Sequence, residues 1–475
     1  MKKSFYITTT LPYVNADPHV GFAAEILRAD FLARYRRLVG DEVFFNTGTD
    51  EHGQKIYQKA CDNNEEVQAY VDRYAQKFDD LKKILNLSYD TFIRTTDEKH
   101  IQAAQEFWKR CEANGDIYKK NYKVKYCVGC ELEKTDSELE NGRCPLHPKD
   151  EIQEIEEENY FFRFSKYQER LLELYKNNQD FVKPDFRLVE ITKFVEGGLQ
   201  DFSISRLKEK MPWGVSVPND DKHVMYVWFD ALVNYISTLN WPQDEENFEK
   251  WWPAIQTCGK DNLRQQSAMW QAMLMSAGLE PSKQIHVFGF INSGGQKMSK
   301  SLGNVINPLD IVNEYGTDAL RYYVARHLSM YEDSDMTMDK FKELYNGNLA
   351  NGLGNLVSRI MKMVENYEVN FKPENFDLNQ NLEMVALMEK FKLNEAMDLI
   401  WNKIQYLDGK IQEEQPFKVA KENLSKAQEM IVDYLPVLWE IGNLLNSFMP
   451  ETAQKIQEII KSNKAPQEPL FLRKE

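Results

Sequence analysis

The chain has 475 residues, a length typical of about three domains. Its composition, 42% hydrophobic and 28% charged, is that of a globular protein and excludes a long disordered or fibrous chain. The formal net charge of −15 excludes a surface coated in positive potential. Any nucleic acid must therefore be bound through local basic patches.

The segment before the first expected strand lacks the apolar core and cleavage site of an export signal. No apolar run approaches the roughly 20 residues that span a bilayer. We therefore expect a cytoplasmic protein that does not enter a membrane. Six cysteines in a chain this long are not a disulfide framework, and three of them cluster between Cys127 and Cys144.

The first 50 residues have the pattern of a strand, a helix and a second strand. Phe5–Leu11 is rich in β-branched and aromatic residues, and Glu42–Asn46 is a similar, shorter run. Between them we expect a helix that ends near Leu38, with Asp17 as its cap and Pro18 in its first position. This order predicts a parallel sheet with a ligand site at the carboxyl ends of its strands.

Helical sequence continues to about Ala113, and strand-like runs at His223–Trp228 and Ile285–Ile291 are expected to complete the sheet. From Asp339 onward apolar residues recur at helical spacing, as in a bundle. The predicted class is α/β, a Rossmann-type parallel sheet with a small zinc-binding insertion, followed by an α-helical bundle. The expected boundaries are 1–114 and 216–291 for the two halves of the sheet domain, 115–215 for the insertion, 292–345 for a connecting region, and 346–475 for the bundle.

Two short hooks of metal-ligand type lie in the insertion. Cys127 and Cys130 form the first, and Cys144 and His147 form the second. Each hook lets two side chains converge on one ion, and two hooks complete a tetrahedron. A Cys₃His set without a spare ligand predicts one structural Zn²⁺ rather than a catalytic one. The alternatives are unrelated loop cysteines or a redox pair, and the latter leaves the second hook unexplained.

Two segments carry features that suit a nucleotide. His19 and Gly21 lie at the strand-to-helix turn, where unpaired N–H groups and the helix dipole favour a phosphate. Lys297 and Lys300 lie in a glycine-containing loop and suit the charge of a polyphosphate. Each segment alone could be structural, as a histidine at a helix start or a solvated basic loop. Each also follows an expected strand, which favours a shared site.

These motifs resemble those of class I aminoacyl-tRNA synthetases, and their neighbours resemble the methionyl-tRNA synthetases among them. The resemblance runs nearly the whole chain, in order, through His19-Val-Gly-Phe22, Lys297-Met-Ser-Lys-Ser301, Leu11-Pro-Tyr13-Val-Asn15, Thr49-Asp50-Glu-His52-Gly, Tyr226-Val-Trp228-Phe-Asp230-Ala, Gly259-Lys-Asp261 and Gly303-Asn-Val. It implies ATP-dependent ligation of L-methionine to tRNA through methionyl-adenylate, with Mg²⁺ accompanying ATP.

The resemblance also implies roles for single residues. His19, Lys297 and Lys300 would act in catalysis, and with Gly21 and Asp261 they would bind ATP, the carboxylate of Asp261 holding the ribose hydroxyls. The implied amino-acid site consists of Leu11, Tyr13, Asp50, Trp228, Tyr235, Gln266 and Trp270, with Asp50 meeting the ammonium group. Sulfur contacts with aromatic rings suit a methionine side chain.

Several positions depart from the family pattern. Phe22 and Phe288 stand where histidine is usual, and we expect the two rings to pack near one another. Gln265 and Gln266 replace a common Phe-His pair in the methionine pocket. The amide of Gln266 is expected to donate toward the thioether in place of the histidine.

The bundle carries Asn355, Arg359 and Phe417, which resemble the anticodon-reading residues of the family. Such side chains recognise unpaired bases by stacking and by hydrogen bonds to their edges. The alternative for Phe417 is a ring that packs between helices. The sequence stops just past the bundle, and we expect a monomer. Its expected partners are tRNA, ATP and L-methionine.

Three other functions remain open. A class I synthetase for another aliphatic amino acid would usually carry a large editing domain, for which the short insertion leaves no room. A tRNA-independent adenylate-forming ligase would have no use for the residues of the bundle. A zinc protein that only binds RNA would have no use for the two signature loops.

Overall fold

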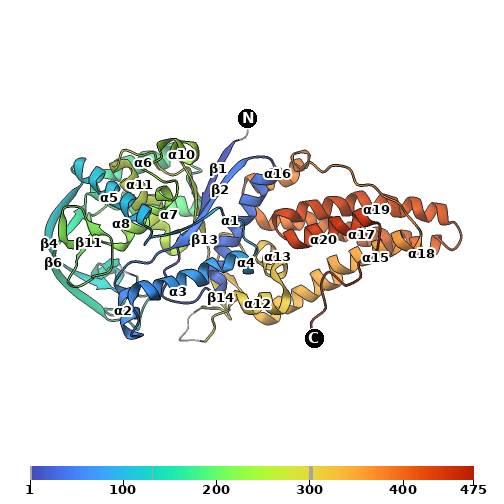
Figure 1. The fold of residues 1–475 in the computed structure, drawn as a ribbon, viewed down its shortest axis with the longest axis horizontal. Coiled ribbons are helices and arrows are strands. Elements are labelled where there is room, and N and C mark those ends of the chain that lie inside the picture. The colour runs from blue at the N-terminus through green and yellow to red at the C-terminus, as the bar shows by residue number, and fades with distance from the viewer. Residues whose placement is uncertain (1–2, 131, 299–302) are drawn as a thin grey trace.

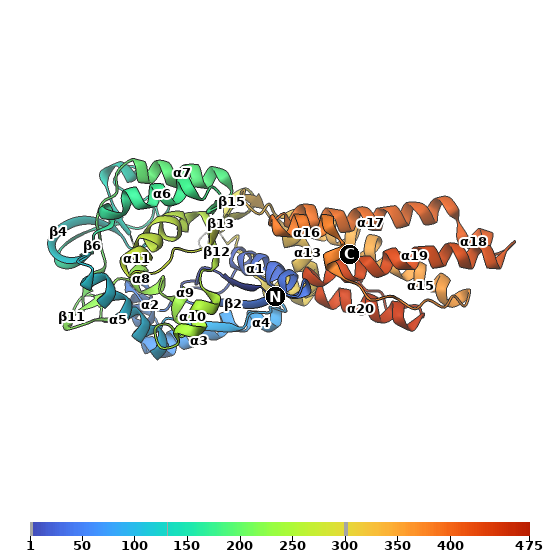
Figure 2. The same ribbon diagram turned by 90° about the horizontal axis from the view of Figure 1, so that it is seen from above.

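The computed structural model describes residues 3–130, 132–298 and 303–475. A sheet-containing part and a long helical bundle lie end to end, and the bundle extends away from the sheet (Figure 1). The view from above shows the same elongated arrangement (Figure 2). Within the described residues, no helix is long and apolar enough to cross a bilayer.

The central sheet has six parallel strands in the order β3-β2-β1-β12-β13-β7. The strands are β1 (Ser4–Thr8), β2 (Glu42–Thr49), β3 (Thr91–Arg94), β7 (Val182–Lys183), β12 (Ile255–Gly259) and β13 (Gln284–Phe288). Helix α1 (Val20–Leu38) connects β1 to β2, so the predicted βαβ opening is confirmed. The strand order extends to either side of β1, and in such sheets the crevice beside the switch point is where ligands bind.

The prediction for His223–Trp228 was right that a strand lies there, up to Met225, but wrong that this strand completes the parallel sheet. Strand β11 (Asp220–Met225) belongs to a separate antiparallel sheet with β9 (Ser205–Leu207) and β10 (Ser216–Val217). On the side away from β2, β1 pairs with β12, whose polar Gln256 and Thr257 are fully buried. Periodicity did not reveal β12, because tertiary contacts rather than local hydrophobicity bury its polar side chains.

A long antiparallel hairpin carries the cysteine cluster. Strand β4 (Ile117–Cys127) pairs along its whole length with β6 (Ile152–Phe162), and β5 (Leu132–Lys134) and β8 (Phe202–Ser203) flank the pair. Cys127 is the last residue of β4 and pairs with Ile152 of β6, and Cys130 follows three residues later. The hairpin thus places the loop between β4 and β6 at its tip, far from the end where Ile117 pairs with Phe162.

The bundle is built from α15 (Asn355–Asn366), α17 (Leu393–Glu414), α19 (Leu424–Leu444) and α20 (Pro450–Ser462). The predicted recurrence of apolar residues at helical spacing is confirmed by buried side chains such as Leu353, Leu356, Ile360 and Met363. Short α18 (Pro416–Val419) joins α17 to α19 at the distal tip (Figure 1).

One fully buried ion pair ties the bundle to the sheet. Arg321 of α13 (Thr317–His327) contacts Asp30 of α1 at 2.7 Å, and it also donates to the carbonyl of Phe448 at the end of the bundle. The opposite charge and the hydrogen bonds compensate for the burial of both groups. The middle of α1 and the base of the bundle are therefore held together by fixed contacts.

Candidate active site

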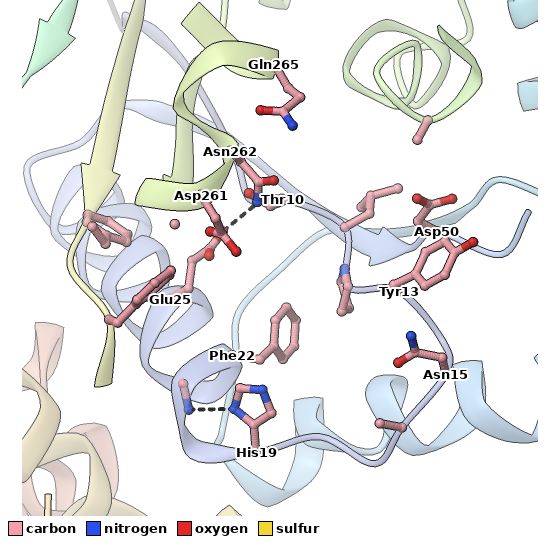
Figure 3. A pocket seen from close by; sticks show the side chains of 18 of the residues that line it. Thr10, Tyr13, Asn15, His19, Phe22, Glu25, Asp50, Asp261, Asn262 and Gln265 are labelled. Carbon is pink, nitrogen blue, oxygen red and sulfur yellow. Dashed lines mark hydrogen bonds between the residues drawn. The ribbon is translucent and has the colours of Figure 1, made fainter. Parts of the chain in front are cut away.

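A cavity of about 540 Å³ opens at the carboxyl ends of β1, β12 and β13 (Figure 3). It lies where the strand order predicts a ligand crevice. Most of the residues predicted for the two substrates line it: Leu11, Tyr13, His19, Gly21, Asp50, Trp228, Tyr235, Asp261, Gln266 and Lys297. Residues distant in the sequence are thus brought to one cavity. Lys300 lies outside the described residues.

The start of α1 differs from the prediction in its cap. Asp17 and Pro18 precede the helix, and His19 is the N-cap, with its Nδ1 accepting from the N–H of Gly21 at 3.1 Å. Gly21 permits this contact, because a Cβ there would lie 2.8 Å from the imidazole. The prediction failed because it assumed a carboxylate cap, whereas an imidazole nitrogen accepts equally well at this position.

The capping contact also determines the tautomer of His19. Desolvation by the surrounding protein lowers the pKa of His19 below its usual value of 6.5, and the nearby Lys297 ammonium acts in the same direction. The neutral ring therefore predominates at pH 7. Since Nδ1 accepts from Gly21, the proton resides on Nε2, which is available to donate into the cavity. A hydrogen-bond donor at this place suits the predicted contact of His19 with a phosphate.

The second signature segment meets the first. The N–H of Val20 donates to the carbonyl of Ile306 at 3.0 Å, which joins the start of α1 to the chain that follows the loop. Lys297, in the hairpin of β14 (Ile291–Ser293) and β15 (Gln296–Lys297), places its Nζ 4.7 Å from the centroid of the Phe290 ring. Two segments almost 280 residues apart therefore border one cavity.

Glu25 is a cavity residue that the sequence did not single out. Its carboxylate accepts from the N–H of Thr10 at 3.0 Å (Figure 3). Burial raises the pKa of Glu25 to about 8, and the neighbouring charge of Asp261 acts in the same direction. The carboxyl group of Glu25 is therefore largely protonated at neutral pH. A glutamate seven residues after a helix-capping turn carries no signal of its own in a single sequence.

Phe22 and Phe288 both line the cavity, but their ring contacts are made with other residues. Phe22 packs edge-on against Phe78 at 5.2 Å. Phe288 packs against Tyr331 at 6.4 Å and beneath the guanidinium of Arg28. No stacking between the two rings is found among the described residues.

The wall near Asp50 suits an amino-acid ligand. Tyr13 and Asp50 form an isolated parallel bridge, and the N–H of Asp50 donates to the carbonyl of Pro12 at 3.0 Å. Trp228 and Tyr235 reach the cavity from α8 (Val227–Ala231) and α9 (Asn234–Ser237). The apolar rings and the buried carboxylate lie within one cavity, as a zwitterion with an apolar side chain requires.

Two predicted pocket residues act differently from expectation. The amide of Gln266 donates to the Tyr235 hydroxyl at 2.5 Å, so this donor is directed to a protein oxygen rather than into the cavity. Trp270 does not line the cavity; it is fully buried behind Tyr235, with the two ring centroids 5.9 Å apart. The sequence could not separate a lining ring from one packed behind it.

A buried cluster supports this wall from behind. One carboxylate oxygen of Asp230 lies 2.6 Å from Nδ1 of His52, and the other lies 2.8 Å from Nε2 of His100. Burial alone would raise the pKa of Asp230, yet the two imidazoles lower it to about 2. Since His52 is two residues from Asp50, and Asp230 two from Trp228, the cluster joins the two sides of the amino-acid site.

The predicted metal ligands converge. The side-chain ligand atoms of Cys127, Cys130, Cys144 and His147 all lie within 4.8 Å of one another. Cys130 Sγ is 3.4 Å from Cys144 Sγ and 3.2 Å from His147 Nδ1. Four ligands about 2.3 Å from a tetrahedral ion would be roughly 3.7 Å apart, so the residues fit zinc in both chemistry and spacing.

The cluster also forms part of the cavity wall, which the sequence did not predict. A Cβ at Gly129 would lie 2.4 Å from the His147 ring, so only glycine allows the two hooks to close. Gly129, Cys130, Leu146 and His147 also line the substrate cavity. The hairpin of β4 and β6 thus brings a candidate metal centre to the wall of the active site, although its four ligands leave no open position for substrate.

The predicted tRNA residues lie at the other end of the molecule. Arg359 of α15 forms an ion pair with Asp408 of α17 at 2.6 Å, and Asn355 is exposed one turn earlier. Phe417 lies at the tip of the bundle with 43% of its surface exposed. This exposure is not that of a ring packed between helices, which was the alternative for Phe417.

Comparisons with known proteins agree with this arrangement. The family model described as "tRNA synthetases class I (M)" matches residues 5–154 and 133–361. A methionine–tRNA ligase of Thermotoga maritima is 40% identical over 97% of this chain and 76% of its own length, and one of a Nostoc species is 40% identical over 96% and 90%. The methionyl-tRNA synthetase of Mycobacterium tuberculosis, solved with methionyl-adenylate, is 36% identical with a TM-score of 0.89, over 96% of this chain and 93% of that one.

The parallel sheet, the two signature segments and these matches define a class I aminoacyl-tRNA synthetase. Within that class the near-complete coverage is decisive. The chain belongs to the methionyl-tRNA synthetase family.

Proposed function

We propose that the chain joins L-methionine to tRNA in two steps, with ATP as the energy source and methionyl-adenylate as the intermediate. The observation that carries this is the single cavity in which the start of α1, Lys297, Asp261 and the aromatic wall near Asp50 meet. ATP and an amino acid both have suitable partners there. Membership of the family supports the same reaction.

In the first step the methionine carboxylate attacks the α-phosphorus of ATP, and pyrophosphate leaves. The carboxylate is already ionised at pH 7, so no general base is required. The protein supplies alignment and neutralisation of the departing charge. His19 Nε2–H and the N–H groups at the start of α1 would contact the phosphates, and Lys297 would close over them.

Specificity for methionine would come from the opposite wall. The carboxylate of Asp50 would pair with the ammonium group, and Leu11, Tyr13, Trp228 and Tyr235 would surround the side chain. Asp261 would accept hydrogen bonds from the ribose hydroxyls, a role that a carboxylate side chain suits. Trp270 would act indirectly, by holding Tyr235 in place.

Two metal ions are implied. Zn²⁺ held by the Cys₃His cluster would stabilise the insertion and, through it, the cavity wall. Mg²⁺ bound with ATP would offset the charge of the polyphosphate.

In the second step the terminal adenosine of the tRNA attacks the mixed anhydride and releases AMP. Asn355, Arg359 and Phe417 would read the anticodon at the far end of the bundle, by stacking and base-edge hydrogen bonds. The domain boundaries stated above follow this division of labour, with 346–475 as the anticodon-binding part. A cytoplasmic location accords with a role in protein synthesis.

The test is ATP–pyrophosphate exchange measured with each of the twenty amino acids separately. Exchange that depends on methionine, with every other amino acid far less effective, is the expected result. Exchange driven best by leucine, isoleucine or valine would replace the proposal with a synthetase for another aliphatic amino acid. A methionine-driven exchange without subsequent charging of tRNA would indicate a ligase that makes adenylate for another acceptor.

A further inference from the structure

The side-chain amide of Gln265, in the wall of the cavity, would find no strong hydrogen-bond partner in a methionine side chain. Gln265 begins the π-helical turn η4 (Gln265–Met269), lines the cavity, and has only 3% of its surface exposed. Its amide is directed into the cavity (Figure 3). Its Oε1 is buried without a hydrogen-bond partner among the described residues. No hydrogen bond from its Nε2 is found among the described residues, so a ligand that places an acceptor against this donor gains a hydrogen bond.

The other glutamines of this region are already engaged. Gln266 donates to Tyr235 and accepts from Gln256 at 3.3 Å. Gln271 donates to the Ser282 hydroxyl and accepts from the N–H of Ser282. Gln265 is thus the member of this group whose amide is left to the ligand.

A thioether cannot satisfy that amide, because its sulfur is only a weak acceptor. A methionine analogue with an oxygen on sulfur has the same carbon chain and adds one strong acceptor. That oxygen would accept a hydrogen bond from the Nε2–H group of Gln265, since an amide nitrogen offers two donor hydrogens. Phenylalanine, usual at this position in the family, has no polar atom to offer.

We propose that Gln265 is a specificity-determining residue that extends the amino-acid site to methionine analogues whose side chain carries a hydrogen-bonding oxygen, with L-methionine sulfoxide as the probe. The inference rests on the proposed function, since it concerns the same activation step. The carboxylate of the analogue attacks the α-phosphorus and pyrophosphate leaves, as with methionine.

The experiment compares kcat/KM for methionine and for L-methionine sulfoxide in pyrophosphate exchange. We expect the unaltered chain to use the sulfoxide within about a hundredfold of methionine. In Gln265→Met, which keeps the length of the side chain but removes the amide, the sulfoxide-to-methionine ratio should fall by about tenfold or more, as the loss of one hydrogen bond to a buried polar group implies. Gln265→Asn retains an amide and should keep more of the ratio than Gln265→Met.

An unchanged ratio in a Gln265→Met variant that still exchanges with methionine would overturn the inference. If that variant does not fold, calorimetric binding of the sulfoxide to the unaltered chain decides, and no binding at millimolar concentration would also overturn it. Failure of the unaltered chain to exchange with methionine would instead refute the proposed function, so the two failures are distinct.

Discussion

The active-site cavity and the tip of the helical bundle hold their functional side chains in different ways. In the cavity each wall is supported from behind: Asp230 holds His52 and His100 beneath the amino-acid site, and Gln266 holds Tyr235. At the tip Phe417 is exposed, and Arg359 is retained by one partly exposed ion pair.

The difference matches what each end would have to do. Alignment of a carboxylate with a phosphorus needs groups held in place before the substrate arrives. An unpaired RNA base can be met by side chains that adjust as it stacks. Changes in the cavity should therefore affect adenylate formation, and changes at the tip only the step that uses tRNA.

The largest effect is expected from Lys297→Ala. Loss of a preorganised charge near the leaving phosphates should lower methionine-dependent pyrophosphate exchange by about a hundredfold. Lys464→Ala, an exposed lysine at the end of the bundle, is the matched control. A Lys297→Ala variant that exchanges as fast as this control would remove the loop from the mechanism.

The second largest effect is expected from loss of the metal, because its predicted ligands form part of the cavity wall. Cys130→Ser, or treatment with a chelator, should lower bound zinc, the midpoint of thermal unfolding and the exchange rate together, the last by about tenfold or more. Cys61→Ser removes an exposed cysteine outside the cluster and serves as the control. Full exchange activity in a metal-free protein would show that the cluster does not shape the site.

At the tip, Phe417→Ala should lower kcat/KM for tRNA by about tenfold, since stacking on one base contributes roughly 1–3 kcal/mol. Pyrophosphate exchange, which needs no tRNA, should be unaffected. Phe186→Ala removes a similarly exposed ring, 49% against 43%, in the sheet-containing part. Unchanged charging of tRNA by Phe417→Ala would end the proposed role of this ring.

The smallest effect concerns pH. Because burial raises the pKa of Glu25 to about 8, the side chain is neutral below that pH and gains a charge above it, beside Asp261. The added negative charge should raise KM for ATP a few-fold between about pH 7 and pH 9. In Glu25→Gln this rise should vanish; a rise of equal size in that variant would assign it to another group.

The same ionisation affects stability. The folded-state pKa of Glu25 lies above the unfolded value of 4.5, so folding is favoured by the proton that the folded state retains. This contribution is fully present below about pH 4.5 and is lost as pH rises through about 8. Thermal unfolding of Glu25→Gln should accordingly depend less on pH in that window than unfolding of the unaltered chain.

The sequence predicted well where a feature is local. The β1–α1–β2 opening follows from periodicity and turn residues, and the metal ligands follow from two short hooks, Cys127–Cys130 and Cys144–His147. Most of the site residues implied by the resemblance line one cavity, and their roles stay predictions. All of these are patterns within short stretches of chain.

Features that depend on distant contacts escaped prediction. Strand β12 is buried by its neighbours despite Gln256 and Thr257. The direction of the Gln266 amide is set by Tyr235, 31 residues away. That the Cys₃His cluster reaches the cavity depends on the length of the hairpin of β4 and β6 and on how it folds over the sheet.

The most direct test of the account is the charging of total tRNA by the purified chain in the presence of ATP and all twenty amino acids. The attached amino acid is then identified by mass spectrometry after mild alkaline release. The account predicts methionine on tRNA and no comparable amount of any other amino acid. A different amino acid on the tRNA, or adenylate formation without any charging, would contradict it.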